Sequence, residues 1–180
     1  MILGPKKLLQ LVKTKQLVEG LAERELKTPE GAGFDIRLGE VHKLDGGKAY
    51  LGLTHRETPK IKTVARYDEK KIISITIRPG QFYLLSSIET FNIPLNITVN
   101  FKPRTTTFRS GLIIRTGNVA PGYHGKVTFA VKNEGPIPVT LELGCRFAHA
   151  QFYQVDGGGT AYKGQWQGGR VTTRKREKQI

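Results

Sequence analysis

Residues 73–80, with the sequence ISITIRPG, set the pattern that most of the chain follows. Isoleucines alternate with hydroxyl side chains, which is the two-residue period of a strand with one buried face, and Pro79-Gly80 then turns the chain. Residues 34–38 alternate in the same way. Short strands separated by turn residues are also expected at 82–85, 97–101, 111–115, 125–132, 139–143 and 147–155. Such spacing predicts a mainly β domain built as an antiparallel sandwich or barrel.

The two ends of the chain depart from this pattern. Residues 5–20 carry leucines and valines at helical spacing, and they predict one N-terminal helix because Pro5 suits a first turn and Gly20 a stop. Residues 23–30 are polar and are expected to be irregular. Three glycines at 157–159 mark a flexible joint. We therefore expect a β domain with its helix at 1–156, and a flexible Gly/Arg-rich tail at 157–180 that could close over an active site.

The composition limits the class of protein. The chain has 180 residues and a net charge of +14, a field that attracts nucleic acids or small phosphates. Five of the cations crowd the last eleven residues, and no zinc finger, helix-turn-helix or stacked-aromatic motif is present, so we do not expect a nucleic-acid partner. The single cysteine, Cys145, excludes an internal disulfide, and no apolar run is long enough to cross a bilayer. A cytoplasmic protein without a membrane partner is expected.

Several familiar sites are excluded by the residues themselves. One cysteine cannot supply the ligands of a zinc-dependent base deaminase. The chain has neither a phosphate-binding loop of the form GxxxxGK[ST] nor a GxSxG nucleophile motif. The four histidines are scattered and predict no metal site. Because there are only four aspartates, carboxylate chemistry has few candidates.

Two segments carry candidate carboxylate and phosphate chemistry. Residues 31–39, GAGFDIRLG, place Asp35 on a strand after glycines that allow a tight turn; the alternative is a plain turn with a surface aspartate. Residues 103–112, PRTTTFRSGL, flank hydroxyls with Arg104 and Arg109, and arginine forks with hydroxyls can grip phosphate oxygens. The alternative is a polar strand edge whose threonines follow from strand propensity.

Two further segments suggest a nucleotide pocket. Residues 117–125, GNVAPGYHG, predict a hairpin whose backbone could bond the edge of a base, with Tyr123 under the sugar, where it would favour deoxyribose. The alternative is an ordinary hairpin with a buried tyrosine. Residues 162–169, YKGQWQGG, combine mobile glycines with aromatic side chains, as in a lid, and the arginines that follow could meet phosphates. The alternative is a disordered basic tail.

Taken in order, these segments resemble the dUTPase and dCTP deaminase superfamily, and in particular the archaeal-type dCTP deaminase-like dUTP nucleotidohydrolases. Residues 31–39 look like its first motif, 104–109 like its Arg-Ser-Ser-x-x-Arg motif with threonines for both serines, and 121–125 like its third motif. Residues 78–85, 133–135 and 143–148 match strands around these motifs, and 162–165 resemble the deaminase-branch tail. The resemblance covers residues 1–170 and depends on the order and spacing of the motifs.

The resemblance implies a distorted antiparallel β barrel or jelly roll that assembles as a homotrimer with active sites between subunits. It also implies that dUTP or dCTP is bound, with Mg²⁺ held mainly by the triphosphate and no metal site on the protein itself. The implied substrate-binding residues are Arg104, Thr105, Thr106 and Arg109 at the phosphates, Tyr123 at the deoxyribose, the backbone near Asn118, Ala120 and Thr128 at the pyrimidine, His149, and Gln165 from the closing tail.

Both carboxylates that activate water in the superfamily are missing. The aspartate of the dUTPase branch corresponds to Ala120, and the glutamate of the deaminase branch corresponds to Ala130. His149 stands where the superfamily usually has a glutamine. Asp35, Glu134 or His149 could take over the missing work, which is worth about 10²–10⁴ in rate. Alternatively, the protein binds nucleotides without turning them over.

We expect Mg²⁺-dependent hydrolysis of dUTP to dUMP and pyrophosphate, with Asp35 and Arg109 as the catalytic residues. Pyrophosphate release can rely on Mg²⁺ and arginines, so the missing carboxylates should damage it less than they damage deamination at C4. A zinc-free dCTP deaminase, alone or bifunctional, stays open because the tail and the N-terminal helix are closer to that branch. A nucleotide-binding regulator and an unrelated nucleic-acid-binding module also stay open.

Overall fold

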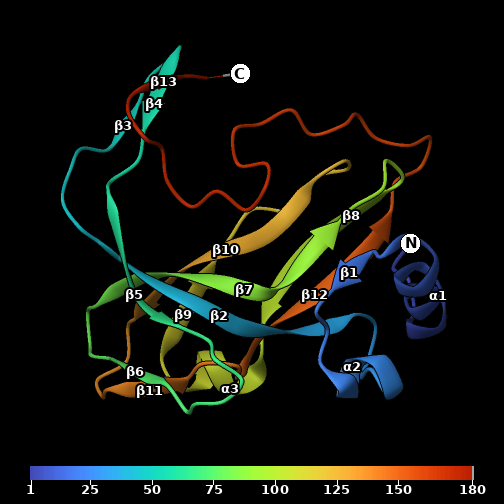
Figure 1. Cartoon of the computed structure of the whole chain (residues 1–180), viewed down its shortest axis with the longest axis horizontal. Coiled ribbons are helices and arrows are strands. Elements are labelled where there is room, and N and C mark those ends of the chain that lie inside the picture. Colours follow the sequence, from blue (N-terminus) through green and yellow to red (C-terminus); the bar gives the residue numbers. More distant parts are fainter. Residues whose placement is uncertain (180) are drawn as a thin grey trace.

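The computed structural model describes residues 1–179 and places a rolled antiparallel sheet beside short helices (Figure 1). Residue 180, the last of the predicted tail, lies outside the described residues. The helices are α1 (Pro5–Lys15), α2 (Glu23–Lys27) and α3 (Thr105–Arg109). The strands are β1 (Val18–Glu19), β2 (Phe34–Leu44), β3 (Tyr50–Leu51), β4 (His55–Glu57), β5 (Ile61–Arg66), β6 (Ser74–Ile77), β7 (Phe82–Asn92), β8 (Ile97–Pro103), β9 (Leu112–Arg115), β10 (His124–Asn133), β11 (Val139–Glu142), β12 (Arg146–Gln154) and β13 (Glu177–Lys178).

The main sheet runs in the order β8-β12-β2-β7-β10-β9, and every neighbouring pair is antiparallel. β5 and β1 extend it by pairing with β2 and β7. The sheet closes on itself where Val99 of β8 and Val119, which precedes β10, exchange backbone hydrogen bonds of 3.0 and 2.8 Å. The fold is therefore the distorted antiparallel barrel with an N-terminal helix that the sequence predicted. The helices among residues 1–179 are too short and too polar to cross a bilayer.

Aromatic rings fill the barrel. Phe129 on β10 meets Phe101 of β8 and Phe147 of β12 edge to face, with 5.0 and 4.9 Å between ring centroids. Phe34 of β2 and Phe152 of β12 form a similar pair at 5.7 Å. Such pairs add about 0.5–1.5 kcal/mol each beyond the burial of their area. The apolar side of each alternating strand thus supplies the core.

The N-terminal helix is shorter than predicted. It ends at Lys15, because Gln16 takes a left-handed conformation with φ of 50° while its N–H donates to the carbonyl of Val12 at 3.0 Å. Leu17 and Val18 then turn into the core, where both are buried, and Val18 begins β1. The prediction extended the helix to Gly20 because these two apolar residues continue its spacing by chance.

Other local predictions are corrected by tertiary contacts. Residues 23–30 contain α2 rather than an irregular stretch. Residues 105–109 form α3, so the alternative of a polar strand edge is wrong: Thr107 is buried and donates a hydrogen bond to the carbonyl of Phe147 at 2.9 Å. β2 and β7 extend well beyond the predicted 34–38 and 82–85. β3, β4, β5 and β13 were not predicted.

Candidate functional site

The tail crosses β10 (Figure 1), and residues of both line a cavity with a volume of about 440 Å³. Hydrogen bonds from Gly168 and Gln167 help to hold the tail there. The amide of Gly168 donates to the carbonyl of His124 at 2.8 Å, and the side chain of Gln167 donates to the carbonyl of Gly122 at 3.0 Å. The crossing requires a glycine at 125, because a Cβ there would lie 2.3 Å from the backbone of the tail.

Four residues predicted from the sequence line this cavity: Asn118, Ala120, Tyr123 and Thr128. The first two belong to the segment before β10, and Thr128 lies on the face of β10 that alternates with its buried side chains. Tyr123 donates a hydrogen bond to the carbonyl of Lys126 at 2.6 Å. Burial raises the pKa of the Tyr123 hydroxyl to about 12, so this group is neutral at physiological pH.

The tail adds a wall that sequence analysis identified only in part. Tyr162 stands edge-on to Tyr123, with ring centroids 5.6 Å apart, and Trp166 and Arg170 also face the cavity. The guanidinium of Arg56 lies 4.8 Å from the centroid of the Trp166 ring. The aromatic residues signalled a lid and the arginines that follow them, of which Arg170 is the first, were expected to meet phosphates, but Arg56 was missed. No local pattern marks Arg56, because its partner lies far along the chain.

Two other predicted residues lie outside this cavity. The side-chain amide of Gln165 donates to the carbonyl of Lys178 at 2.8 Å, which turns it toward the end of the tail. Ala130 shares the outer face of β10 with Thr128 but faces a neighbouring hollow, together with Glu134. Glu134 is paired there with Lys132 at 2.8 Å.

The charged residues on the cavity wall are both cations, and both have a carboxylate partner: Lys126 Nζ lies 3.6 Å from Glu40, and Arg170 is paired with Glu177. Within the described part of the chain, no Asp, Glu, His or Cys lines the cavity. The cavity therefore suits a flat, partly apolar group with negative charge nearby, but it offers no general base of its own.

The predicted phosphate residues lie at the opposite end of the barrel. Arg104 caps α3, and Thr105, Thr106 and Arg109 are exposed on it because Thr107 anchors the other side of the helix. Figure 1 shows α3 far from the tail. None of these four candidates lines the cavity. One chain by itself does not bring the predicted phosphate grip to the predicted pyrimidine pocket.

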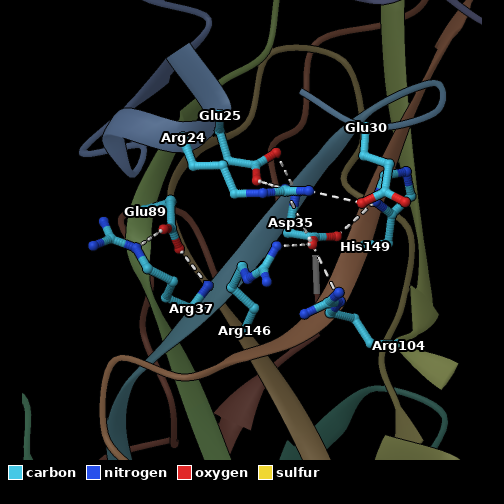
Figure 2. A network of polar contacts seen from close by, with 9 residues as sticks. All are labelled: Arg24, Glu25, Glu30, Asp35, Arg37, Glu89, Arg104, Arg146 and His149. Carbon is cyan, nitrogen blue, oxygen red and sulfur yellow. Dashed lines mark hydrogen bonds and ion pairs between the residues drawn. The ribbon is translucent and has the colours of Figure 1, made fainter. Parts of the chain in front are cut away.

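Asp35 joins the phosphate end of the site rather than the cavity (Figure 2). Its carboxylate accepts a hydrogen bond from Arg146 Nη1 at 3.0 Å and lies 3.1 Å from Arg104 Nε and 3.0 Å from His149 Nδ1. Arg24 of α2 lies further off, at 3.8 Å. The structure thus brings three predicted residues together, Asp35, Arg104 and His149, and adds two arginines that sequence reasoning missed.

The surroundings of Asp35 keep it charged. Burial alone would raise its pKa, but the hydrogen bond with His149 and the charges of Arg104 and Arg146 outweigh burial and hold the pKa below its ordinary value. A carboxylate with a lowered pKa is a weak base. This geometry supports a positioning role for Asp35, because it fixes the side chain of Arg104 beside α3.

We expect Asp35→Asn to lower the free energy of unfolding near neutral pH by about 1–3 kcal/mol, because it leaves the arginines without their charged partner. A lowered native pKa contributes stability above the unfolded value and loses it as the pH falls through the native value. The difference from wild type should therefore shrink below about pH 4. Urea unfolding of both proteins near neutral pH and below about pH 4 measures this difference in the free energy of unfolding.

Asp45→Asn is the matched control, since Asp45 is exposed and forms no ion pair with residues 1–179. An Asp35→Asn loss of equal size at neutral and acid pH would mean that packing, and not charge, is what Asp35 contributes.

Several known proteins are similar in sequence to this chain. Residues 2–155 match the family described as dCTP deaminase-like. A "dCTP deaminase" of Pyrobaculum islandicum is 30% identical over 174 residues, covering 96% of this chain and 95% of the relative. A "dCTP deaminase, dUMP-forming" of Dictyoglomus turgidum is 28% identical over 159 residues, covering 86% and 81%. A "Probable deoxyuridine 5'-triphosphate nucleotidohydrolase" of Methanopyrus kandleri is 29% identical over 135 residues, covering 75% and 84%.

A solved structure shares the fold. The 2'-deoxycytidine 5'-triphosphate deaminase from Agrobacterium tumefaciens superimposes with a TM-score of 0.62 at 15% sequence identity. The match covers 84% of this chain and 47% of the other, so this chain spans about half the length of that protein. At this identity the likeness concerns the fold alone.

Proposed function

The chain belongs to the dCTP deaminase-like family, which confirms the resemblance seen in its sequence, and on this premise we propose that it binds a pyrimidine deoxynucleoside triphosphate and hydrolyses dUTP. The products are dUMP and pyrophosphate. One observation carries the proposal: Asn118, Ala120, Tyr123 and Thr128, singled out from sequence motifs, line one cavity.

The cavity suits a base and a deoxyribose. Its wall is mainly apolar, with hydrogen-bonding groups at Asn118 and Thr128, and a volume of about 440 Å³ accommodates a nucleoside. The ring of Tyr123, held by its hydrogen bond to the Lys126 carbonyl, offers a fixed surface for the sugar. Tyr162 and Trp166 of the tail shield the group from water.

The phosphates need a second copy of the chain. α3 exposes Thr105, Thr106 and Arg109 at the end of the barrel away from the cavity of its own chain. We propose that α3 of a neighbouring copy reaches the cavity in a homotrimer, where Lys126 and Arg170 already provide positive charge. Asp35 positions Arg104 for this contact.

We propose that a divalent cation enters this site with the substrate. Mg²⁺ would be held mainly by the triphosphate oxygens and would offset their charge. The chain's own residues bind and orient: the arginines stabilise charge that develops on the phosphates, and Tyr123 and the tail hold the nucleoside.

The choice of hydrolysis over deamination rests on the cavity wall. Attack at C4 of cytosine needs a group beside the base that moves protons, but Ala130 replaces the glutamate of the deaminase branch and the described cavity wall has no carboxylate. The same observation favours a second candidate, which is binding of a deoxynucleoside triphosphate without turnover.

Incubation with dUTP and with dCTP, each with Mg²⁺, separates these candidates. We expect pyrophosphate from dUTP and no ammonia from dCTP, because the cavity can bind the base but cannot move protons at C4. Pyrophosphate and ammonia are measured by coupled assays. Ammonia from dCTP would contradict the proposal in favour of deamination. Tight dUTP binding without product would favour the second candidate.

Ala120→Asp tests the missing base directly. We expect it to raise the rate of pyrophosphate release from dUTP by about 10²–10⁴, because it places a carboxylate on the cavity wall. Ala120→Asn is the control, since it has the same shape and no basic oxygen pair. Equal rates for the two variants, with dUTP still bound, would show that a base at 120 has no access to the reacting phosphate.

Arg104→Ala tests the phosphate grip. Loss of a charged hydrogen bond worth about 1.5–3 kcal/mol should weaken binding of a non-hydrolysable dUTP analogue at least tenfold, while deoxyuridine binding stays nearly unchanged. Calorimetric titration measures both affinities, and thermal unfolding confirms that the variant folds without its contact to Asp35. Arg78→Ala, an exposed arginine elsewhere, is the control. Equal losses of affinity for the dUTP analogue and for deoxyuridine would show that Arg104 does not bind the phosphates.

A further inference from the structure

More than half of the excess positive charge lies in two segments that meet on one side of the molecule, which we call the basic arm (residues 43–66 and 170–179). It contains β3, β4 and β13, which extend away from the barrel in Figure 1, together with β5 and the end of β2, which belong to the main sheet. These two segments carry eleven lysines and arginines against three carboxylates, Asp45, Glu57 and Glu177. A net +8 of the chain's +14 therefore lies in 34 residues.

The two segments of the arm are fixed to each other without using most of these cations. Thr58 and Thr173 exchange hydrogen bonds, each backbone N–H donating to the other's hydroxyl, at 3.0 and 2.9 Å. Thr172 donates its hydroxyl hydrogen to the carbonyl of Pro59 at 2.7 Å. β13 pairs with β4, with Lys178 opposite His55. The arm is thus an ordered scaffold for its charges.

Four of the eleven cations have partners, and seven do not. Arg56 lies against Trp166, and carboxylates pair with Arg66, Arg170 and Arg176. The other seven are exposed, and no carboxylate of residues 1–179 forms an ion pair with them; they are Lys43, Lys48, Lys60, Lys62, Arg174, Lys175 and Lys178.

The placement of these charges costs stability in the free protein. Lys43 and Lys62 are direct partners across the β2–β5 ladder, and like charges in that position repel. Lys60 lies just before β5, two residues before Lys62. A row of cations along a strand matches the repeating negative charge of a nucleic-acid backbone better than it matches one compact phosphate group.

The tip of the arm adds aromatic and apolar surface. Tyr50 is 42% exposed, and the guanidinium of Arg176 lies 4.1 Å from its ring centroid. Leu51 and Leu53 beside it are 87% and 101% exposed. Proteins that bind single strands combine a positive track for the backbone with exposed rings on which bases stack.

We propose that the basic arm binds single-stranded nucleic acid through its phosphodiester backbone, using its seven exposed cations, none of which lines the nucleotide cavity, although Thr58 and Arg170 of the same arm do. No continuous motif predicts this surface, because the arm is assembled from segments more than a hundred residues apart. Its tail half also lies beyond residues 2–155, which match the family.

The test uses the full chain and a labelled oligothymidylate of about 20 nucleotides, with fluorescence anisotropy measured across a range of salt concentrations. The arm variant is Lys43→Gln/Lys60→Gln/Lys62→Gln. We expect it to bind at least tenfold more weakly and to lower the slope of log affinity against log salt by about 2, since each phosphate contact contributes about 0.7. Affinity for a non-hydrolysable dUTP analogue should stay unchanged.

The matched control is Lys6→Gln/Lys7→Gln/Lys13→Gln, which removes the same charge from exposed positions on α1. It should leave oligonucleotide binding unchanged. Equal losses in the two variants would overturn the proposal, because net charge alone would then explain binding. The proposal would also be overturned if wild type showed no salt-dependent binding, if vesicles containing phosphatidylserine bound and the oligonucleotide did not, or if the arm variant lost dUTP-analogue affinity in parallel.

Discussion

The buried carboxylate of Asp35 is the charge on which one end of the barrel depends. It lies on β2 and meets Arg146 and His149 of β12, which are 111 and 114 residues further along the chain. A buried carboxylate without partners costs several kcal/mol, so the register of these strands has to bring such partners to it. Arg104 begins α3 and binds the same carboxylate, so the charge on β2 also sets the direction of the helix that exposes Thr105 and Thr106.

The fold was predictable where one face of a strand is buried. The alternation at 73–77 and 125–132 needs no distant information, because period and burial are read from neighbouring residues. Residues 105–109 show the limit. Their threonines favour a strand, but Thr107 bonds the carbonyl of Phe147 and the segment becomes a helix. β4 could not be predicted either, since its partner β13 lies at the far end of the chain.

The residues of the candidate site likewise fall into some that the local sequence predicts and others that only tertiary contacts reveal. One short segment contains Asn118, Ala120 and Tyr123, so the sequence motif predicted them as neighbours, and all three line the cavity. Arg170 reaches the cavity through the path of the tail, and the same path brings Trp166 against Arg56 of β4. Asp35 was recognised as a candidate, but its arginine neighbours come from α2, from the residue before α3 and from β12, and their charges favour a positioning role for it. Residue identity predicts that a carboxylate is present, whereas its basicity depends on tertiary contacts.

The seam at Val99 and Val119 closes the barrel wall through one pair of backbone hydrogen bonds, and the Thr98 hydroxyl supports it by donating to the Val119 carbonyl at 2.9 Å. Val119 stands between Asn118 and Ala120 and lines the cavity together with them. A molecule that binds the cavity only when this wall is closed would therefore also stabilise the closed barrel, because binding and closure would then be linked.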